Sequence, residues 1–266
     1  MKSLIYPFLL LAILFGSTAC EEVIELELSN SEPKMVIEGL ITDQALAPAQ
    51  VQLSMSGSYF EPGSYPAIEG AEVVLISSSG ERTTLVEEEA GLYKAADLVG
   101  TVGEAYTLEI DANGEIVRTQ TTMNKTIVLD SVSFGSRGGG PMEGLLAQVH
   151  LQDPAGEENF LRFVVWLNGQ PYPNIFIYND ALSDGVATIA PLSIPGLKSG
   201  DVLSIQALSL DRSGYDYFNT LSSIVGASFG PAGQSAAPAN PSSNIEGNAV
   251  GYFGAHAVSS ISVVVP

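Results

Sequence analysis

Residues 71–86, AEVVLISSSGERTTLV, indicate the fold class of this chain. An apolar run at 73–76 is followed by the turn-forming residues SSSG at 77–80, and a second strand-like run covers 82–86. A turn signal between two short strand-like segments is typical of a β-hairpin. We therefore expect two antiparallel strands here, and the same pattern recurs on both sides of this stretch.

The first half of the chain consists of short strand patterns separated by turns. They lie at residues 35–41, 51–55, 71–76, 82–86, 106–110 and 115–121. The last two are joined by the turn sequence DANG at 111–114. No helical period appears in this half. We therefore predict an Ig-like β-sandwich over residues 34–124.

A second β-rich domain is predicted over residues 127–266, joined to the first near Lys125. Its strand patterns lie at 127–134, 145–151, 160–167, 202–210 and 257–265. Only residues 213–225 show the spacing of a helix. Trp166, in the most apolar strand, is expected in the core. The predicted fold class is therefore all-β, with two domains and one short helix.

Composition and charge exclude several classes of function. The 266 residues include 30 acidic and 10 basic side chains, for a net charge of −20, which repels phosphate backbones and argues against nucleic-acid binding. A single cysteine cannot form an intrachain disulfide, and two histidines cannot form a multi-histidine metal site. We expect no cofactor and no metal.

The N-terminus carries the layout of an export signal. Lys2 precedes an apolar run at 4–15, which is too short to remain as a membrane-spanning helix. Small residues at 16–19 then lead directly to Cys20, as in a bacterial lipobox, although Ser17 stands where leucine is usual. We therefore predict a lipoprotein signal peptide over 1–19 and lipidation of Cys20, which would anchor the chain to a membrane. An ordinary signal peptide with a chance cysteine is the alternative.

An acidic tether is expected over residues 20–33. Glu21 and Glu22, directly behind the cysteine, resemble the surface-export signal of some Gram-negative lipoproteins. The other interpretation is a solvated tether without a sorting role. The cell surface is slightly favoured over the periplasmic face of the outer membrane, and both stay open.

A serine-hydrolase motif occurs in the wrong context. Residues 226–230, GASFG, match the G-x-S-x-G pattern around Ser228. That motif needs a strand before it and a helix after it, whereas the helix predicted at 213–225 precedes this one and Pro231 follows. A glycine-rich helix exit explains the pattern as well, although His256 could serve as a base. We assign no catalytic residues and expect no enzyme.

Three acidic clusters are candidate calcium ligands, at residues 87–89, 153–159 and 179–185. None has the spacing of an EF-hand loop, and Asp and Gly at these places are ordinary turn residues. We assign no metal-binding residues.

Six aromatic residues are candidate contacts for a partner. They lie in two segments that contain proline or glycine, and are Tyr59, Phe60, Tyr65, Tyr172, Phe176 and Tyr178. Exposed aromatic side chains on loops often form binding surfaces. The alternative is that these rings cover the ends of the sandwiches.

The order of several motifs resembles a known family. After Cys20-Glu21-Glu22 come MVIEGLITD at 35–43, GAEVVL at 70–75, NPSSNI at 240–245 and GYFGA at 251–255. This arrangement resembles the bacterial lipoprotein family catalogued as domain of unknown function 4249. The first half also resembles the transthyretin-like or carboxypeptidase-regulatory sandwich.

The resemblance implies an outer-membrane lipoprotein, often encoded beside a TonB-dependent transporter, and implies no catalytic residues. The function expected is therefore an accessory protein that binds a ligand or a partner and is associated with such a transporter. A structural or adhesive envelope lipoprotein is the alternative, and a hydrolase ranks third.

Overall fold

The computed structural model describes residues 32–57, 63–112, 114–137, 144–181, 183–228 and 240–266. Pro33–Pro266 form one compact unit, and α2 (Arg212–Ser228) is the helix among its described strands. The predicted all-β fold class is thereby confirmed. The strands are β1 (Met35–Thr42), β2 (Ala49–Met55), β3 (Glu72–Ser77), β4 (Arg82–Glu89), β5 (Leu92–Ala95), β6 (Ala105–Ala112), β7 (Glu115–Thr122), β8 (Leu129–Arg137), β9 (Gly144–Gln152), β10 (Phe160–Leu167), β11 (Gln170–Asn179), β12 (Ala187–Leu192), β13 (Val202–Leu210), β14 (Ala249–His256) and β15 (Val258–Val264).

The hairpin predicted at residues 71–86 is present as β3 and β4. Val73 pairs with Leu85 and Ile76 with Arg82 in antiparallel register. Gly80 has a φ of 90° at the turn, a conformation that glycine adopts without the steric cost of a side chain.

The first sandwich is a single eight-stranded sheet that folds around its own core. Its strand order is β14-β1-β2-β5-β4-β3-β6-β7. Leu53, Leu75 and Leu108 are fully buried or nearly so and belong to one cluster. The two end strands of the sheet meet, because the backbone N–H of Ala255 in β14 donates to Thr121 Oγ1 in β7 at 3.4 Å.

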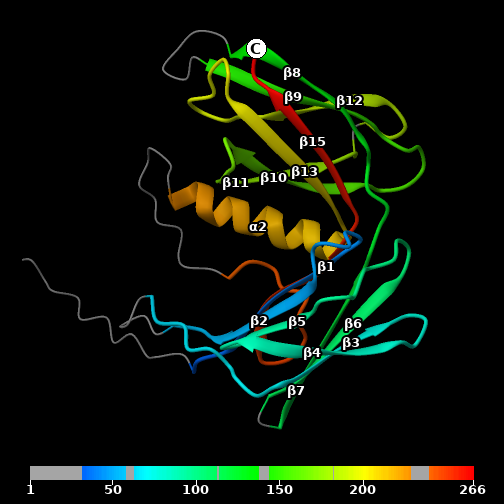
Figure 1. Cartoon of the computed structure of the whole chain (residues 1–266), viewed down its shortest axis with the longest axis vertical. Helices are drawn as coiled ribbons and strands as arrows, with labels where there is room; N and C mark the ends of the chain where they lie inside the picture. The colour runs from blue at the N-terminus through cyan, green and yellow to red at the C-terminus, as the bar shows by residue number, and fades with distance from the viewer. Residues whose placement is uncertain (1–31, 58–62, 113, 138–143, 182, 229–239) are drawn as a thin grey trace, which may run out of the picture. The chain divides into compact units, whose positions relative to one another are not determined.

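The second sandwich packs a four-stranded sheet on a three-stranded sheet (Figure 1). The strand orders are β11-β10-β13-β15 and β12-β9-β8. Val149, Phe163 and Ile205 supply its apolar core. Trp166 is only partly buried and lies outside this core, beside Ser204 and Ile261, so its predicted core position is wrong.

The predicted division into two separate domains needs a correction. The core does change near the predicted boundary, since Met123 packs in the first cluster and Ile127 in the second. However, β14 returns to the first sheet and pairs in parallel with β1, from Met35 opposite Ala249 to Thr42 opposite His256. The chain then enters β15 of the second sandwich after a single residue. The chain therefore crosses between the sandwiches three times, which joins them into one unit.

Helix α2 lies between the two sandwiches (Figure 1). Asp211 caps its N-terminus, because Asp211 Oδ1 accepts a hydrogen bond of 2.7 Å from the backbone N–H of Gly214. Phe218 of the helix joins Phe160 and Tyr252 in a third apolar cluster, which connects the sandwiches. Across the described ranges, no helix has the length and hydrophobicity needed to cross a membrane.

Candidate functional site

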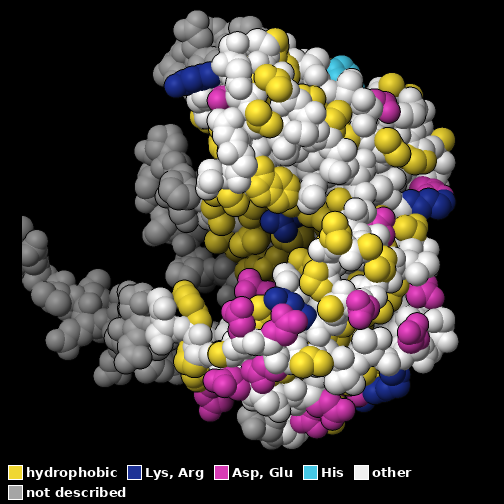
Figure 2. All heavy atoms as spheres, in the orientation of Figure 1, with side chains coloured by type: hydrophobic (Ala, Val, Ile, Leu, Met, Phe, Trp, Pro, Cys, Tyr) yellow, Lys and Arg dark blue, Asp and Glu magenta, His cyan; other side chains and the backbone are white. Residues whose placement is uncertain are grey.

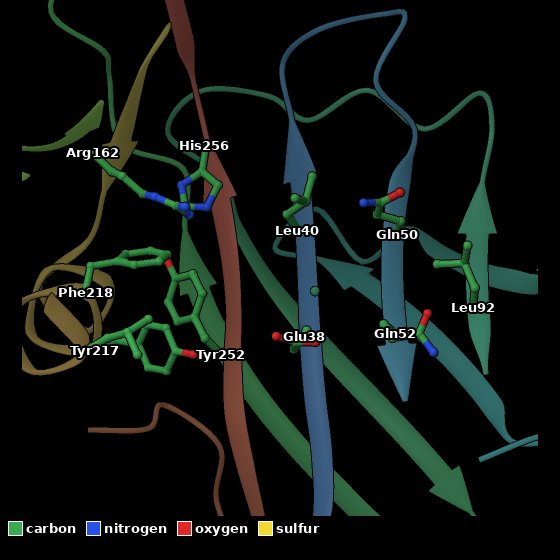
Figure 3. Close-up of a pocket in the computed structure, with 12 residues that line it drawn as sticks. Glu38, Leu40, Gln50, Gln52, Leu92, Arg162, Tyr217, Phe218, Tyr252 and His256 are labelled. Atoms are coloured by element: carbon green, nitrogen blue, oxygen red, sulfur yellow. The ribbon is translucent and has the colours of Figure 1, made fainter. Parts of the chain in front are cut away.

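A cleft of about 490 Å³ opens where the outer face of the first sheet meets β10 and α2. Figure 2 shows a hollow with hydrophobic walls and a basic side chain inside it. Arg162 is the basic residue among those that line the cleft. In the close-up, Arg162, Tyr217, Phe218, Tyr252 and His256 cluster on one side, while β1, β2 and β5 form the other (Figure 3). This volume lies in the range of small-molecule sites.

Strand β14 supplies two lining residues through its period of two. Tyr252 and His256 face the cleft, whereas Phe253 and Ala255 face the core of the first sandwich. A Cβ on Gly254, between them, would overlap both Tyr252 Oη and His256 Nε2. The missing side chain at this position therefore leaves room for both polar groups to approach each other.

The phenol of Tyr252 is buried without a hydrogen bond. The residue is 7% exposed, and its Oη has no partner among the described residues. Tyr217 stacks on its ring at a centroid distance of 4.9 Å, and Phe218 meets it edge-on at 5.1 Å. Burial raises the pKa of Tyr252 well above its ordinary value, so the hydroxyl stays protonated and can donate a hydrogen bond.

Arg162 places a positive charge in the same corner. In β10, Leu161 and Phe163 point into the second core, and Arg162 between them points to the opposite face. Its guanidinium lies over the ring of Phe218 at 4.2 Å, a cation–π contact. Burial lowers the pKa of Arg162, because desolvation disfavours the charged form.

This guanidinium has no acidic partner among the described residues, and Arg162 Nε is buried without a hydrogen bond. A buried charge without a counter-charge costs several kcal/mol, so such groups are normally paired. Arg162 is partly buried, so a ligand anion that pairs with it would recover part of this cost.

His256 is neutral and held in one orientation. It is 5% exposed, and its Nδ1 lies 2.7 Å from the carbonyl oxygen of Ser209. Burial, together with the nearby charge of Arg162, lowers its pKa from 6.5 to about 4. At neutral pH Nδ1–H therefore donates to Ser209, and Nε2 is a hydrogen-bond acceptor.

We expect His256 to make the fold acid-sensitive. Its pKa is lower in the folded chain, so the folded state resists protonation. The stability it contributes is complete above pH 6.5 and is lost as the pH falls through about 4, by up to about 3 kcal/mol. Denaturant titrations between pH 7 and pH 4 measure this loss. His256→Asn keeps a donor near Ser209 and cannot titrate, so its stability should fall less steeply. If the free energy of unfolding falls equally with pH in the unmodified protein and in His256→Asn, the prediction is wrong.

Of the six aromatic residues predicted to bind a partner, the four that the structure describes do not line this cleft. Tyr59 and Phe60 lie outside the described residues, and Tyr65 is 66% exposed. The segment with the other three is strand β11 and not a loop. Tyr172 and Phe176 stack at 6.2 Å and pack, with Tyr178, against the second core. The proposal of a binding surface at this segment is withdrawn.

The hydrolase motif does not have the backbone of a nucleophile elbow. Helix α2 continues through Ser228, so a helix stands where the motif requires a strand. The side chain of Ser228 lies outside the description. Elsewhere, Ser133 Oγ lies 2.7 Å from His150 Nε2 on neighbouring strands. No carboxylate among the described residues orients that imidazole, as a catalytic serine would require.

Two of the three acidic clusters come together in space. Gly185 N–H donates to Asp153 Oδ2, and Gly156 N–H donates to Asp184 Oδ1. Asp153 is 2% exposed, and its pKa is raised by burial and by the charges of Asp180 and Asp184. In the described part of the chain, no group of these residues has the arrangement needed to hold a metal ion.

Sequence reasoning missed the residues that line the cleft. A lone arginine inside the apolar strand FLRFVVWL at 160–167 was the available signal for Arg162. The alternation in GYFGAH at 251–256 was the signal for Tyr252 and His256. Neither signal predicts that β10 and β14 lie close together, because β10 belongs to the second sandwich and β14 to the first.

Fold and site define the class: an all-β protein of two joined sandwiches with a cleft at their junction. The chain belongs to the family described as a domain of unknown function (DUF4249), whose profile matches residues 21–262. The resemblance of its motifs to this family is thereby confirmed.

Two solved structures share part of this chain's length at low identity. The chain is similar to a segment of two fibronectin type-III domains from chicken tenascin, with 15% identity, 69% of this chain and 92% of that chain covered, and a TM-score of 0.23. It is also similar to bovine butyrophilin, with 9% identity, coverage of 89% and 100%, and a TM-score of 0.21. No curated protein is detectably similar.

Proposed function

We propose that this chain is a lipid-anchored outer-membrane protein that binds a ligand in the cleft and acts as an accessory of a TonB-dependent transporter. The observation that carries ligand binding is the cleft itself, where the partly buried Arg162 has no acidic partner and the buried phenol of Tyr252 has no hydrogen-bond partner among the described residues. Unsatisfied buried groups cost free energy, and a ligand that pairs with them recovers it.

The anchor and the transporter come from the sequence. Residues 1–20 have the layout of a lipoprotein signal, and the motifs resemble lipoproteins encoded beside such transporters. A purely structural or adhesive protein does not require an unpaired cation in a cleft. A hydrolase requires a nucleophile with its base, and the described residues hold no such arrangement in the cleft.

Co-purification tests the transporter association. The tagged full-length chain is cross-linked in native membranes, and the captured proteins are identified by mass spectrometry. We expect a TonB-dependent transporter among them in stoichiometric amount. Capture of structural envelope proteins alone would favour the adhesive alternative. Turnover of ester, peptide or glycan substrates by the purified chain would restore the hydrolase.

Cys20→Ser tests the anchor. The variant cannot receive lipid, and several acyl chains are needed for stable attachment. We expect the protein to move from the outer-membrane fraction to the soluble fraction and to retain its signal peptide. Fractionation, with mass spectrometry of the N-terminus, measures both effects. A Cys20→Ser protein that still sediments with the outer membrane and is processed normally would refute the anchor.

A further inference from the structure

The corner of the cleft that holds Arg162 has the chemistry of an anion site. The guanidinium is fixed over Phe218 at 4.2 Å, so its position does not depend on a carboxylate partner. Tyr252, from strand β14, holds a protonated hydroxyl without a hydrogen-bond partner among the described residues at the base of this corner, packed against Gly214 of α2 and Gly254. A cation and a hydroxyl donor in one apolar corner are a recognition pair for an oxyanion, because charge-assisted hydrogen bonds strengthen where water is excluded.

The surrounding charges limit this anion to a single negative charge. Arg162 is the basic residue of the cleft, and Glu38 lies on β1, on the opposite side of the cleft in Figure 3. Burial and the charge of Glu38 raise the pKa of Tyr217. Asp211 lies close enough to raise the pKa of Tyr252, although its own oxygens already accept hydrogen bonds from the protein, such as that of Thr121. Because Glu38 and Asp211 already add negative charge and Arg162 can pair with one anionic group, a phosphate dianion is disfavoured more strongly here than a carboxylate.

His256 adds a requirement next to the carboxylate. Its Nε2 accepts hydrogen bonds at neutral pH, and it lies near Tyr252 Oη across Gly254. An acceptor beside the oxyanion repels a second anionic oxygen and favours an N–H or O–H group of the ligand. A hydroxyl or amide on the carbon next to the carboxylate satisfies this demand.

The remainder of the cleft suits an apolar body with a few polar groups. Leu40, Leu92 and Leu221 supply apolar surface, and Gln50 and Gln52 supply amide groups that can donate or accept. In Figure 3, Leu40, Leu92, Gln50 and Gln52 lie on the far side of the cleft from Arg162. Leu221 belongs to α2. The volume of about 490 Å³ accommodates a small molecule.

We propose that the cleft binds a small carboxylic acid, held through its carboxylate by Arg162 and Tyr252, with an adjacent hydroxyl or amide donor facing His256 and an apolar body against β1, β2 and β5. The assignment rests on the proposed function, since it names the ligand class of the same cleft.

Binding is tested on the purified full-length chain in detergent with three acids of increasing size: lactate, mandelate and N-benzoylglycine. Their neutral amides are the matched control ligands, and inorganic phosphate is the competing anion. The readouts are calorimetry and the NMR signal of the Arg162 Nε–H, assigned by its loss in Arg162→Met. We expect at least one acid to bind with a Kd of about 1 mM or tighter and to shift that signal.

Two variants connect binding to the residues. Arg162→Met keeps the apolar contact with Phe218 and should weaken acid binding at least tenfold, while the melting temperature stays equal or rises because a partly buried charge without an ion-pair partner among the described residues is removed. Lys198→Met makes the same change in net charge at an exposed site and should bind like the unmodified protein. Tyr252→Phe removes only the hydroxyl and should weaken binding about tenfold at most, in keeping with one hydrogen bond to a charged group.

Several results would overturn the proposal. These are the absence of binding by all three acids, equal binding of the neutral amides, binding of phosphate in preference to the acids, or unchanged affinity in Arg162→Met. None of them affects the membrane fractionation or the transporter capture, so failure of the ligand class is distinguishable from failure of the anchor and the association.

Discussion

Gly251→Ala should lower the free energy of unfolding by about 3 kcal/mol or more. Gly251 lies in β14 opposite Ile37 of β1, with a φ of 120° that side-chain-bearing residues rarely adopt. A Cβ at this position would also overlap the carbonyl oxygen of Ile37. Because both effects act on the parallel pairing of β14 with β1, the substitution should loosen the strand that joins the sandwiches. Equilibrium denaturation of the purified chain measures the loss.

Gly247→Ala is the matched control for this prediction. Gly247 also has a positive φ, of 95°, but a Cβ there would meet no atom within 4 Å. Gly247→Ala should therefore lower the free energy of unfolding only by the backbone penalty of about 1–2 kcal/mol. If the two variants are equally stable, β14 does not approach β1 as described, and the cleft built on that approach fails with it.

The double variant Tyr172→Ala/Phe176→Ala should also be strongly destabilised, by about 3 kcal/mol. Both rings extend the core of the second sandwich, and they stack on each other at 6.2 Å. Their removal leaves a cavity beside Phe163, which pairs with Phe176 in the neighbouring strand. A thermal or denaturant melt of the folded chain shows the effect.

Tyr65→Ala serves as the control, because that ring is 66% exposed and should change stability by less than about 0.5 kcal/mol. A double variant as stable as the Tyr65 variant would show that the rings of β11 are surface groups. The aromatic residues of β11 would then again be candidates for contact with a partner.

The position of β14 is also what creates the cleft. Tyr252 and His256 belong to a strand of the first sheet, whereas Arg162 belongs to the second sandwich, and Phe218 comes from the helix between them. Only the return of the chain to the edge of β1 brings these groups together. Loss of that pairing should therefore abolish ligand binding together with stability.

The sequence by itself determined the local features of this protein. Alternation of apolar residues and turn signals such as SSSG at 77–80 predicted the β3–β4 hairpin, the all-β class and the helix at α2, because these depend on neighbours in the chain. The order of its motifs also indicated the family to which the chain belongs.

The tertiary structure decided which distant strands meet. The 200 and more residues between β1 and β14 carry no signal of their parallel register, because pairing across a sheet edge depends on burial and backbone geometry at both ends of a long connection. The sequence likewise could not show whether the aromatic residues of β11 lie in a loop or in a strand. Their pairing and packing beside Phe163 decide this, and both depend on the tertiary structure. The cleft exists for the same reason: Arg162 is an isolated charge in the sequence, and only the fold places it against Phe218 and beside Tyr252.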